Sequence, residues 1–253
     1  MLLIRSTLAI YRDSALDAVR ATTRSAYGFV FLLLLAPLLK VAGIALSPLG
    51  MIGGMAASLL MAACAGTYLA TLDDTLGAAS SRGLSLATLR GNLGRYTSEV
   101  LGVAFPIWIG GLILSFVPGP LYWIYQVVVA VAFNVSPEMI GRTRSSGIEL
   151  LGDSLRWLKD NGPEWFIPQA LLLLPIALWR PGSVATILSM FGPQFGFVNA
   201  GGALLGMDGP ISWVGAFGMV VYIHAMMLFR AALFIRLGRG GRRQRLWKAR
   251  VGG

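Results

Sequence analysis

Six long apolar stretches constrain the fold of this chain more than any other feature. Each is close to the length that a helix needs to cross a hydrocarbon core of about 30 Å. They cover residues 27–47, 51–72, 98–117, 120–136, 165–181 and 210–236. The sequence therefore predicts an all-α, polytopic integral membrane protein with about six transmembrane helices and amphipathic helices on its cytoplasmic face.

The composition agrees with this class. Hydrophobic residues make up 56% of the chain and charged residues 13%, against about 25% charged residues in soluble domains. Such a chain has too little polar surface to cover a water-soluble globule. We expect one membrane domain over residues 27–236, preceded by a cytoplasmic amphipathic segment, 1–26, and followed by a basic cytoplasmic tail, 237–253.

The basic residues predict the orientation. When the six stretches are threaded alternately through a bilayer, 18 of the 21 Lys and Arg residues fall in segments on one side, and that side holds both termini. Only Arg180 and Lys40 lie toward the other side. The positive-inside rule then places both termini in the cytoplasm of a multi-pass protein of the cell (inner) membrane. The Arg-rich start also suits the mitochondrial inner membrane, but Asp13 and Asp17 count against a presequence.

The connections suggest an internal repeat. Segments 2–20, 84–93 and 148–158 each carry an amphipathic helical pattern, and each precedes a pair of apolar stretches. A proline follows within or at the entry of the next stretch in all three cases, namely Pro37, Pro106 and Pro168. A threefold hairpin repeat explains this order, although any protein with long inner loops can show such links. We expect these helices to lie in the headgroup layer.

The last outer connection, residues 182–209, differs from the other two. It is apolar and Gly-rich, which suits an interfacial or re-entrant element buried against protein. Two short extra spans, making eight, are the alternative. If the chain has a pocket or gate, it is expected here, with Gly192, Pro193, Gly196 and Gly201 as candidates; the alternative is a lipid-facing cap that only packs. Lys40 either lines the same cavity or extends to the outer interface.

Other polar residues near the inner face have simple expected roles. Arg230 is expected to extend inward to the headgroups. Gln126 and Asn134 suit hydrogen bonds between helices. The loop from Pro137 to Trp165 is rich in mixed charge and either pairs with itself or docks a cytoplasmic partner. Within it, the residues 160–163 predict a turn that ends one helix before the next begins.

Cys64 and His224 are the one pair that suggests catalysis. Each lies about 20 Å below the outer surface at helical rise, so a thiolate and an imidazole base can meet there. The stretch 62–66, AACAG, resembles the cysteine motif of exosortase-type membrane transpeptidases, but the span count and the arginine and histidine spacings of that family are not reproduced. The alternative is that Cys64 fills space in the core and His224 is a satisfied polar group. A single Cys gives no zinc-type spacing, and whether the protein holds a cofactor stays unknown from the sequence.

Two further sets of residues predict contacts. Small residues recur on the second apolar stretch and favour close helix packing; they are Gly50, Gly53, Gly54, Ala57 and Ser58. Basic residues and one Trp follow the last stretch and favour anionic lipids over nucleic acid; they are Arg236, Arg239, Arg242, Arg243, Arg245, Trp247, Lys248 and Arg250.

These patterns lead to three hypotheses of function. Ionisable residues are scarce within the apolar stretches, which favours a non-enzymatic structural, assembly or transport-accessory subunit with a membrane or cytoplasmic protein partner. A small transporter or permease component with its gate in residues 182–209 is the first alternative. An intramembrane thiol enzyme built on Cys64 and His224 is the second.

Overall fold

The described residues consist mostly of helices and contain no strand. The computed structural model describes residues 2–24, 26–77, 86–117, 119–179, 193, 195 and 210–238. The all-α prediction is therefore confirmed for this part of the chain. The basic tail beyond residue 238 and most of the expected outer element, 182–209, lie outside the described residues.

Three helical hairpins form the body of the molecule. The first consists of α2 (Ala26–Leu46) and α3 (Gly50–Leu76), joined by a single 3-10 turn, η1 (Ser47–Leu49). The second consists of α5 (Thr97–Ser115) and α6 (Leu121–Ala132). The third pairs the second half of α8 (Gly147–Trp179) with α10 (Pro210–Gly238). These bounds lie close to those of the apolar stretches, because an apolar run must satisfy its own backbone groups and the helix does so internally.

The amphipathic patterns lie on α1 (Leu2–Arg24), α4 (Leu86–Gly91) and the first half of α8. The one remaining described helix, α7 (Ser136–Met139), is a single buried turn. The headgroup-layer position expected for these helices stays a prediction. The structure shows that α1 packs lengthwise against α10 and buries Ser14, Ala18 and Ala21. This follows from their size, since small side chains spaced at three and four residues allow two helices to approach closely.

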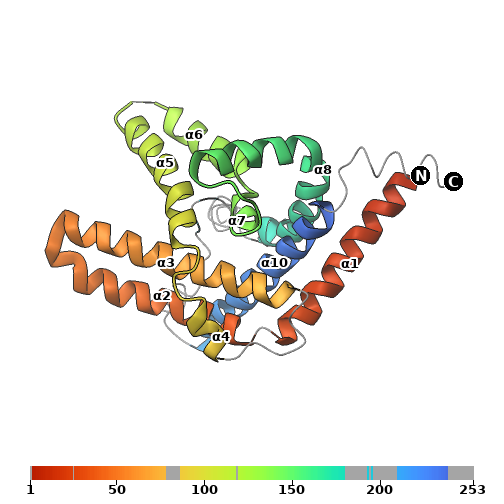
Figure 1. Ribbon diagram of the computed structural model, residues 1–253, viewed down its shortest axis with the longest axis horizontal. Coiled ribbons are helices and arrows are strands. Elements are labelled where there is room, and N and C mark those ends of the chain that lie inside the picture. The colour runs from red at the N-terminus through yellow and green to blue at the C-terminus, as the bar shows by residue number, and fades with distance from the viewer. Residues whose placement is uncertain are drawn as a thin grey trace.

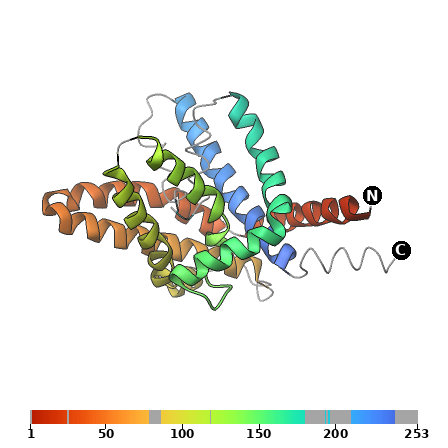
Figure 2. The same ribbon diagram turned by 90° about the horizontal axis from the view of Figure 1, so that it is seen from above.

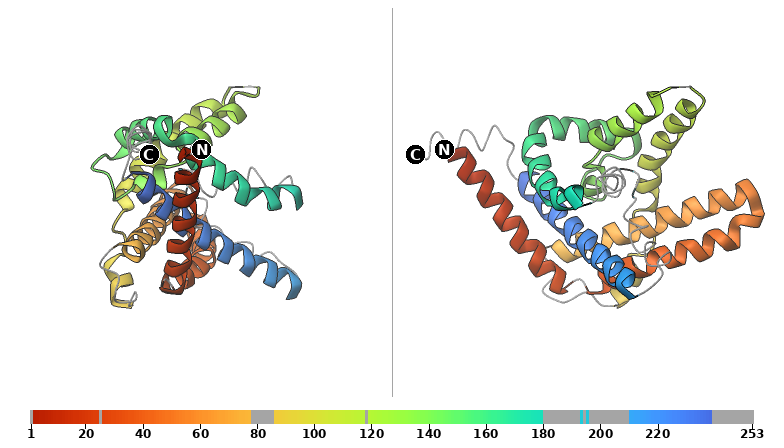
Figure 3. Two further views of the ribbon diagram at one scale, coloured as in Figure 1. Left: turned by 90° about the vertical axis from the view of Figure 1, so that its right-hand side faces the viewer. Right: turned by 180° about the vertical axis from the view of Figure 1, so that it is seen from behind.

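The three hairpins converge at one end and diverge at the other (Figure 1). The tips of α2–α3 and α5–α6 point in different directions, and the end of α8 and the start of α10 project together in a third (Figure 3). The convergent ends hold the core, including Tyr68 and Val103. The tips are exposed and apolar, with Met51 82% and Phe116 79% exposed.

Helix α10 lies at the centre of the convergent ends. In its apolar window 67% of the residues are buried, and it contacts both helices of the first hairpin, its own partner α8, the short helix α7 and α1. The fully buried α10 side chains include Val220, Ile223, Leu228 and Leu233. The last helix of the described chain thus packs against the first and third hairpins and against α1.

Membrane association is supported by three helical segments that are long and apolar enough to cross a bilayer, namely 26–76, 97–115 and 217–238. The first contains both arms of the α2–α3 hairpin. Six separate spans are not established. The expected fourth span is shorter than predicted, because α6 has 12 residues and extends only about 18 Å at helical rise.

Helix α8 departs from the expected turn at residues 160–163. It continues as one helix of 33 residues but bends strongly between its two halves (Figure 2). A proline inside a helix removes one backbone donor and clashes with the preceding turn, which bends a helix without necessarily ending it. Nearby, the Asn161 side-chain amide donates to the Trp157 carbonyl at 3.2 Å and so stabilises the last turn before Pro163.

Candidate functional site

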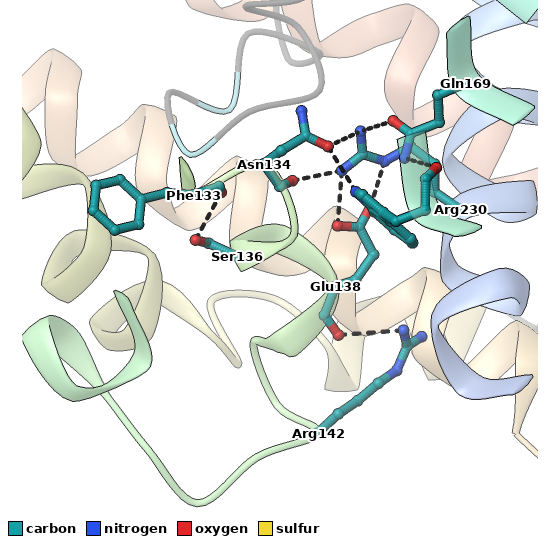
Figure 4. A network of polar contacts seen from close by, with 8 residues as sticks. Phe133, Asn134, Ser136, Glu138, Arg142, Gln169 and Arg230 are labelled. Atoms are coloured by element: carbon teal, nitrogen blue, oxygen red, sulfur yellow. Dashed lines mark hydrogen bonds and ion pairs between the residues drawn. The ribbon is translucent and has the colours of Figure 1, made fainter. Parts of the chain in front are cut away.

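A buried charged cluster around Arg230 is the most constrained polar site in the described chain. Arg230 comes from α10, Glu138 from α7, Gln169 from α8, and Asn134 from the turn between α6 and α7. The Arg230 side chain is 0% exposed and that of Glu138 1%. Figure 4 shows the four side chains pointing toward one another. The cluster therefore joins the second hairpin to both arms of the third.

The Arg230 guanidinium uses all five of its N–H groups. Nε and Nη2 donate to the two carboxylate oxygens of Glu138 at 2.6 and 2.9 Å. Nη1 donates to the side-chain oxygens of Asn134 at 3.0 Å and Gln169 at 2.8 Å, while the second Nη2 proton goes to the Asn134 carbonyl at 2.6 Å. Because arginine has five donors and no acceptor, the group has no hydrogen-bonding capacity left for a substrate.

An aromatic side chain completes this cluster. Trp165 of α8 is fully buried and donates from its indole nitrogen to the Asn134 side-chain oxygen at 3.0 Å. Its ring also lies under the Arg230 guanidinium, with 5.0 Å from the guanidinium carbon to the ring centroid. A cation over an aromatic face is favourable when both are desolvated. Trp165 thereby fixes the plane of Arg230 as well as the orientation of Asn134.

A second ion pair extends the site toward the first hairpin. Arg142, in the turn after α7, donates from Nε to Asp73 of α3 at 2.8 Å, and its Nη1 approaches the Glu138 carbonyl at 3.3 Å. Tyr96 donates to the other Asp73 oxygen at 3.3 Å. Burial and the negative charge of Asp73 raise the pKa of Tyr96, so its phenol stays a donor at neutral pH.

The backbone is adapted to this arrangement at Gly141, next to Arg142. Gly141 has a φ of +74°, and a Cβ atom placed there would collide with the Tyr96 ring. Both observations require glycine, because other residues rarely adopt this conformation and none would fit under the ring. The Tyr96–Asp73–Arg142 contacts therefore depend on this residue.

Ion pairs also connect α10 to α1. Arg236 donates from Nε to Asp17 at 2.9 Å and approaches Asp13 at 3.5 Å. This residue was predicted to bind lipid, and in the structure its charge is shared with two carboxylates of α1. The other predicted lipid-binding residues lie outside the described residues, so that role stays a prediction.

His224 meets a tyrosine. Its Nδ1 atom is 2.9 Å from the Tyr68 hydroxyl, which joins α10 to α3. Cys64 is buried one helical turn before Tyr68 on the same helix. The contact of His224 with Tyr68 is thus a phenol–imidazole one, and the Cys64–His224 pairing stays a hypothesis.

The small residues that were predicted to favour close helix packing lie on two different faces of α3. Gly53 is buried, and a Cβ atom there would collide with the Leu46 carbonyl of α2. Ala57 lies partly buried beside it. Gly50, Gly54 and Ser58 are exposed. Close packing within the chain is therefore confined to the Gly53 face.

The predicted gate residues are mostly outside the described part of the chain. Pro193 is described and buried, and Lys40 is exposed on α2. Gly192, Gly196 and Gly201 lie outside the described residues. Within the described ranges there is also no group of three or more side chains that could hold a metal ion.

Sequence reasoning missed the Arg230 cluster. It expected Arg230 to extend to the headgroups and placed Glu138 in a solvated loop, whereas both are buried. One signal in the sequence could have found it: an arginine within a span is costly unless an acidic residue pairs with it. Glu138 was a candidate acid, because it follows the predicted span that contains Asn134. The 92 residues between the two partners hid the pairing.

Comparisons with known proteins give no relative: no family model, no curated protein and no solved structure matches the chain.

Proposed function

We propose that this protein is a non-enzymatic integral membrane protein, a structural, assembly or transport-accessory subunit that acts through its surfaces. The observation that carries the proposal is the complete pairing of Arg230. A buried charge that serves transport or catalysis must exchange partners during its cycle, whereas all five Arg230 donors are already used inside the protein. The cluster is thus suited to holding helices together.

The exposed apolar tips of the hairpins support action through surfaces. Trp108 on α5 and Ile44 on α2 are 59% and 67% exposed, and the hairpins on which they lie diverge. Divergent hairpins leave apolar flanks that lipid or other membrane helices must cover. Since apolar surface gives little driving force in lipid, a partner helix would be held by close packing, and the exposed Gly50, Gly54 and Ser58 face of α3 allows this.

The proposed orientation places the convergent ends at the cytoplasmic face. The ion pairs Arg236–Asp17, Arg142–Asp73 and Arg95–Asp74 gather there, where water and headgroups accommodate charge. Both termini then lie in the cytoplasm, and the tail continues from Arg236 toward anionic lipid. This agrees with the positive-inside distribution.

The two alternatives have weaker support. A thiol enzyme needs His224 as the base for Cys64, yet its Nδ1 atom is bonded to Tyr68. A transporter with its gate in residues 182–209 has no contact among the described residues that favours it. We therefore place both behind the subunit hypothesis.

Site-specific photo-crosslinking in cells tests the proposal. A photoreactive residue replaces Trp108 or Ile44 on the exposed flanks, and Val103, which is fully buried, serves as the control. We expect discrete protein adducts from at least one flank and none from Val103.

Reconstitution into liposomes provides the complementary measurement. The proposal predicts no solute movement by the purified protein alone. Two results together would favour the transporter alternative. They are crosslinking to lipid and to no protein at both flank positions, and solute flux by the purified protein alone.

A further inference from the structure

A groove between α1, α8 and α10 has the size of a ligand site. Its volume is about 580 Å³, within the range of about 300–1,000 Å³ typical of small-molecule pockets. All three helices contribute apolar side chains to its walls, among them Ala15 and Val19 of α1, Leu171 and Leu172 of α8, and Ala225 and Phe229 of α10.

The groove exists because the side chains on α1 are small. Beyond Tyr11 and Arg12 at one end, Ala15, Ala18, Val19 and Thr22 line it at intervals of three and four residues, so this part of α1 presents no long side chain to fill the space. Val19 and Leu171, on opposite walls, are each 64% exposed. The groove is therefore open along its side to the surroundings of the protein.

The hydroxyl groups of the lining are all used by backbone carbonyls. Tyr11 donates to the Glu164 carbonyl at 3.0 Å, Tyr222 to the Leu172 carbonyl at 3.3 Å, and Thr22 to the Ala18 carbonyl at 2.9 Å. These bonds turn polar atoms toward the protein. What remains for an occupant is an apolar surface with one charged group, Arg12, at its end.

The length of the groove matches one leaflet of a bilayer. From Arg12 to Thr22 the α1 wall rises by ten residue steps, or about 15 Å at helical rise, which is half of a hydrocarbon core of about 30 Å. Arg12 lies next to Asp13, which approaches Arg236 at the convergent end of α10. The charged end of the groove is thus level with the proposed cytoplasmic surface.

Arg12 is available to an anion. Its side chain is 74% exposed and pairs with Asp13 at 3.1 Å. An exposed ion pair of this kind contributes little, whereas arginine binds phosphate oxygens by paired hydrogen bonds.

We propose that this groove holds one acyl chain of an anionic phospholipid from the cytoplasmic leaflet, with the lipid phosphate at Arg12. The inference needs only the membrane location that it shares with the proposed function and is independent of any protein partner. It can therefore fail while the subunit hypothesis stands, and the reverse also holds.

Native mass spectrometry of the full-length protein tests this site. The protein is released from micelles that contain palmitoyl-oleoyl phosphatidylglycerol or the matching phosphatidylcholine, and retained lipids are counted by mass. We expect one phosphatidylglycerol molecule to be retained in preference to phosphatidylcholine. Val19→Trp and Leu171→Trp fill the groove from opposite walls, and each should lower retention of both lipids about ten-fold or more, because several methylene groups lose their contacts.

A charge variant separates the contribution of the lipid headgroup to retention from that of the acyl chain. Arg12→Gln should weaken phosphatidylglycerol retention about five-fold and phosphatidylcholine retention less, because choline already compensates the charge of its phosphate. Arg156→Gln is the matched control, since Arg156 is also exposed and paired with a nearby aspartate, Asp153. Val41→Trp on the exposed flank of α2 is the control for added bulk.

Two results would overturn the site. The first is unchanged lipid retention in both groove-filling variants, with helix content and elution volume equal to those of the unmodified protein. The second is a loss of lipid retention in Val41→Trp as large as the loss in the groove-filling variants. Because Val19 and Leu171 are both largely exposed, misfolding of one variant leaves the other to decide.

Discussion

Arg230 has two different energetic roles that are easily confused. Moving a charged pair from water into the interior costs about as much as the pair regains, so the net stability contributed by Arg230 and Glu138 is small. Removing only one of them is a different change, because it leaves the other buried without compensation. Five hydrogen bonds from one planar group also specify a single arrangement of the helices that carry Glu138, Gln169 and Asn134.

The first prediction separates these roles. Arg230→Met should lower the free energy of unfolding by about 3–5 kcal/mol, since the Glu138 carboxylate stays buried and unpaired. The double variant Arg230→Met/Glu138→Leu should recover most of that loss. Reversible unfolding in mixed micelles measures the free energy of unfolding of both variants. Arg156→Gln is the control, and its free energy of unfolding should lie within about 0.5 kcal/mol of that of the unmodified protein. A double variant no more stable than the single one would contradict the account.

The second prediction concerns the backbone at Gly141. Gly141→Ala forces a positive φ on a residue with a Cβ atom, which costs about 1–3 kcal/mol, and the methyl group collides with Tyr96. Gly152→Ala is the matched control, because it lies inside α8 with no atom within 4 Å of an added Cβ and should stabilise by about 0.5–1 kcal/mol. Equal unfolding midpoints for the two variants would disagree with this structure.

At the scale of elements, the helices were largely predictable and their contacts were not. The bounds of α2, α3 and α5 follow from apolar runs, because such a run in lipid has to be helical. The continuation of α8 through Pro163 and the packing of α1 on α10 depend on tertiary contacts. Those contacts join residues such as Asp17 and Arg236, 219 positions apart, which no local pattern specifies.

The docking of α1 gives the third prediction. The Asp17 and Arg236 side chains are 36% and 31% exposed, so their pair is partly screened and should contribute about 1 kcal/mol or less. Asp17→Asn should therefore leave the global fold intact and raise the rate of hydrogen exchange in α1 several-fold over that of the unmodified protein. This increase should be larger at low ionic strength than at high ionic strength, because salt screens the pair in the unmodified protein. Asp153→Asn, which removes an exposed pair within α8, should leave α1 unchanged. Unaltered exchange in α1 after Asp17→Asn would show that its small-residue face alone holds it.

For the molecule as a whole, the account is one of three hairpins joined at one end and separate at the other. Charge asymmetry in the sequence predicts which end faces the cytoplasm, but not that the hairpins meet there through Arg230. Complete pairing of Arg230 at the convergent end specifies one arrangement of the segments that meet there. The divergent apolar tips are left to contact lipid and partners, which is the basis of the proposed function.

Hydrogen exchange of Arg230→Met in mild detergent tests the central claim most directly. The cluster joins α7, α8 and α10, so the account predicts faster exchange at the same time around Glu138, around Gln169 and in α10, with Arg156→Gln unchanged throughout. Faster exchange confined to α10, or none at all, would contradict the claim that Arg230 holds the hairpins together.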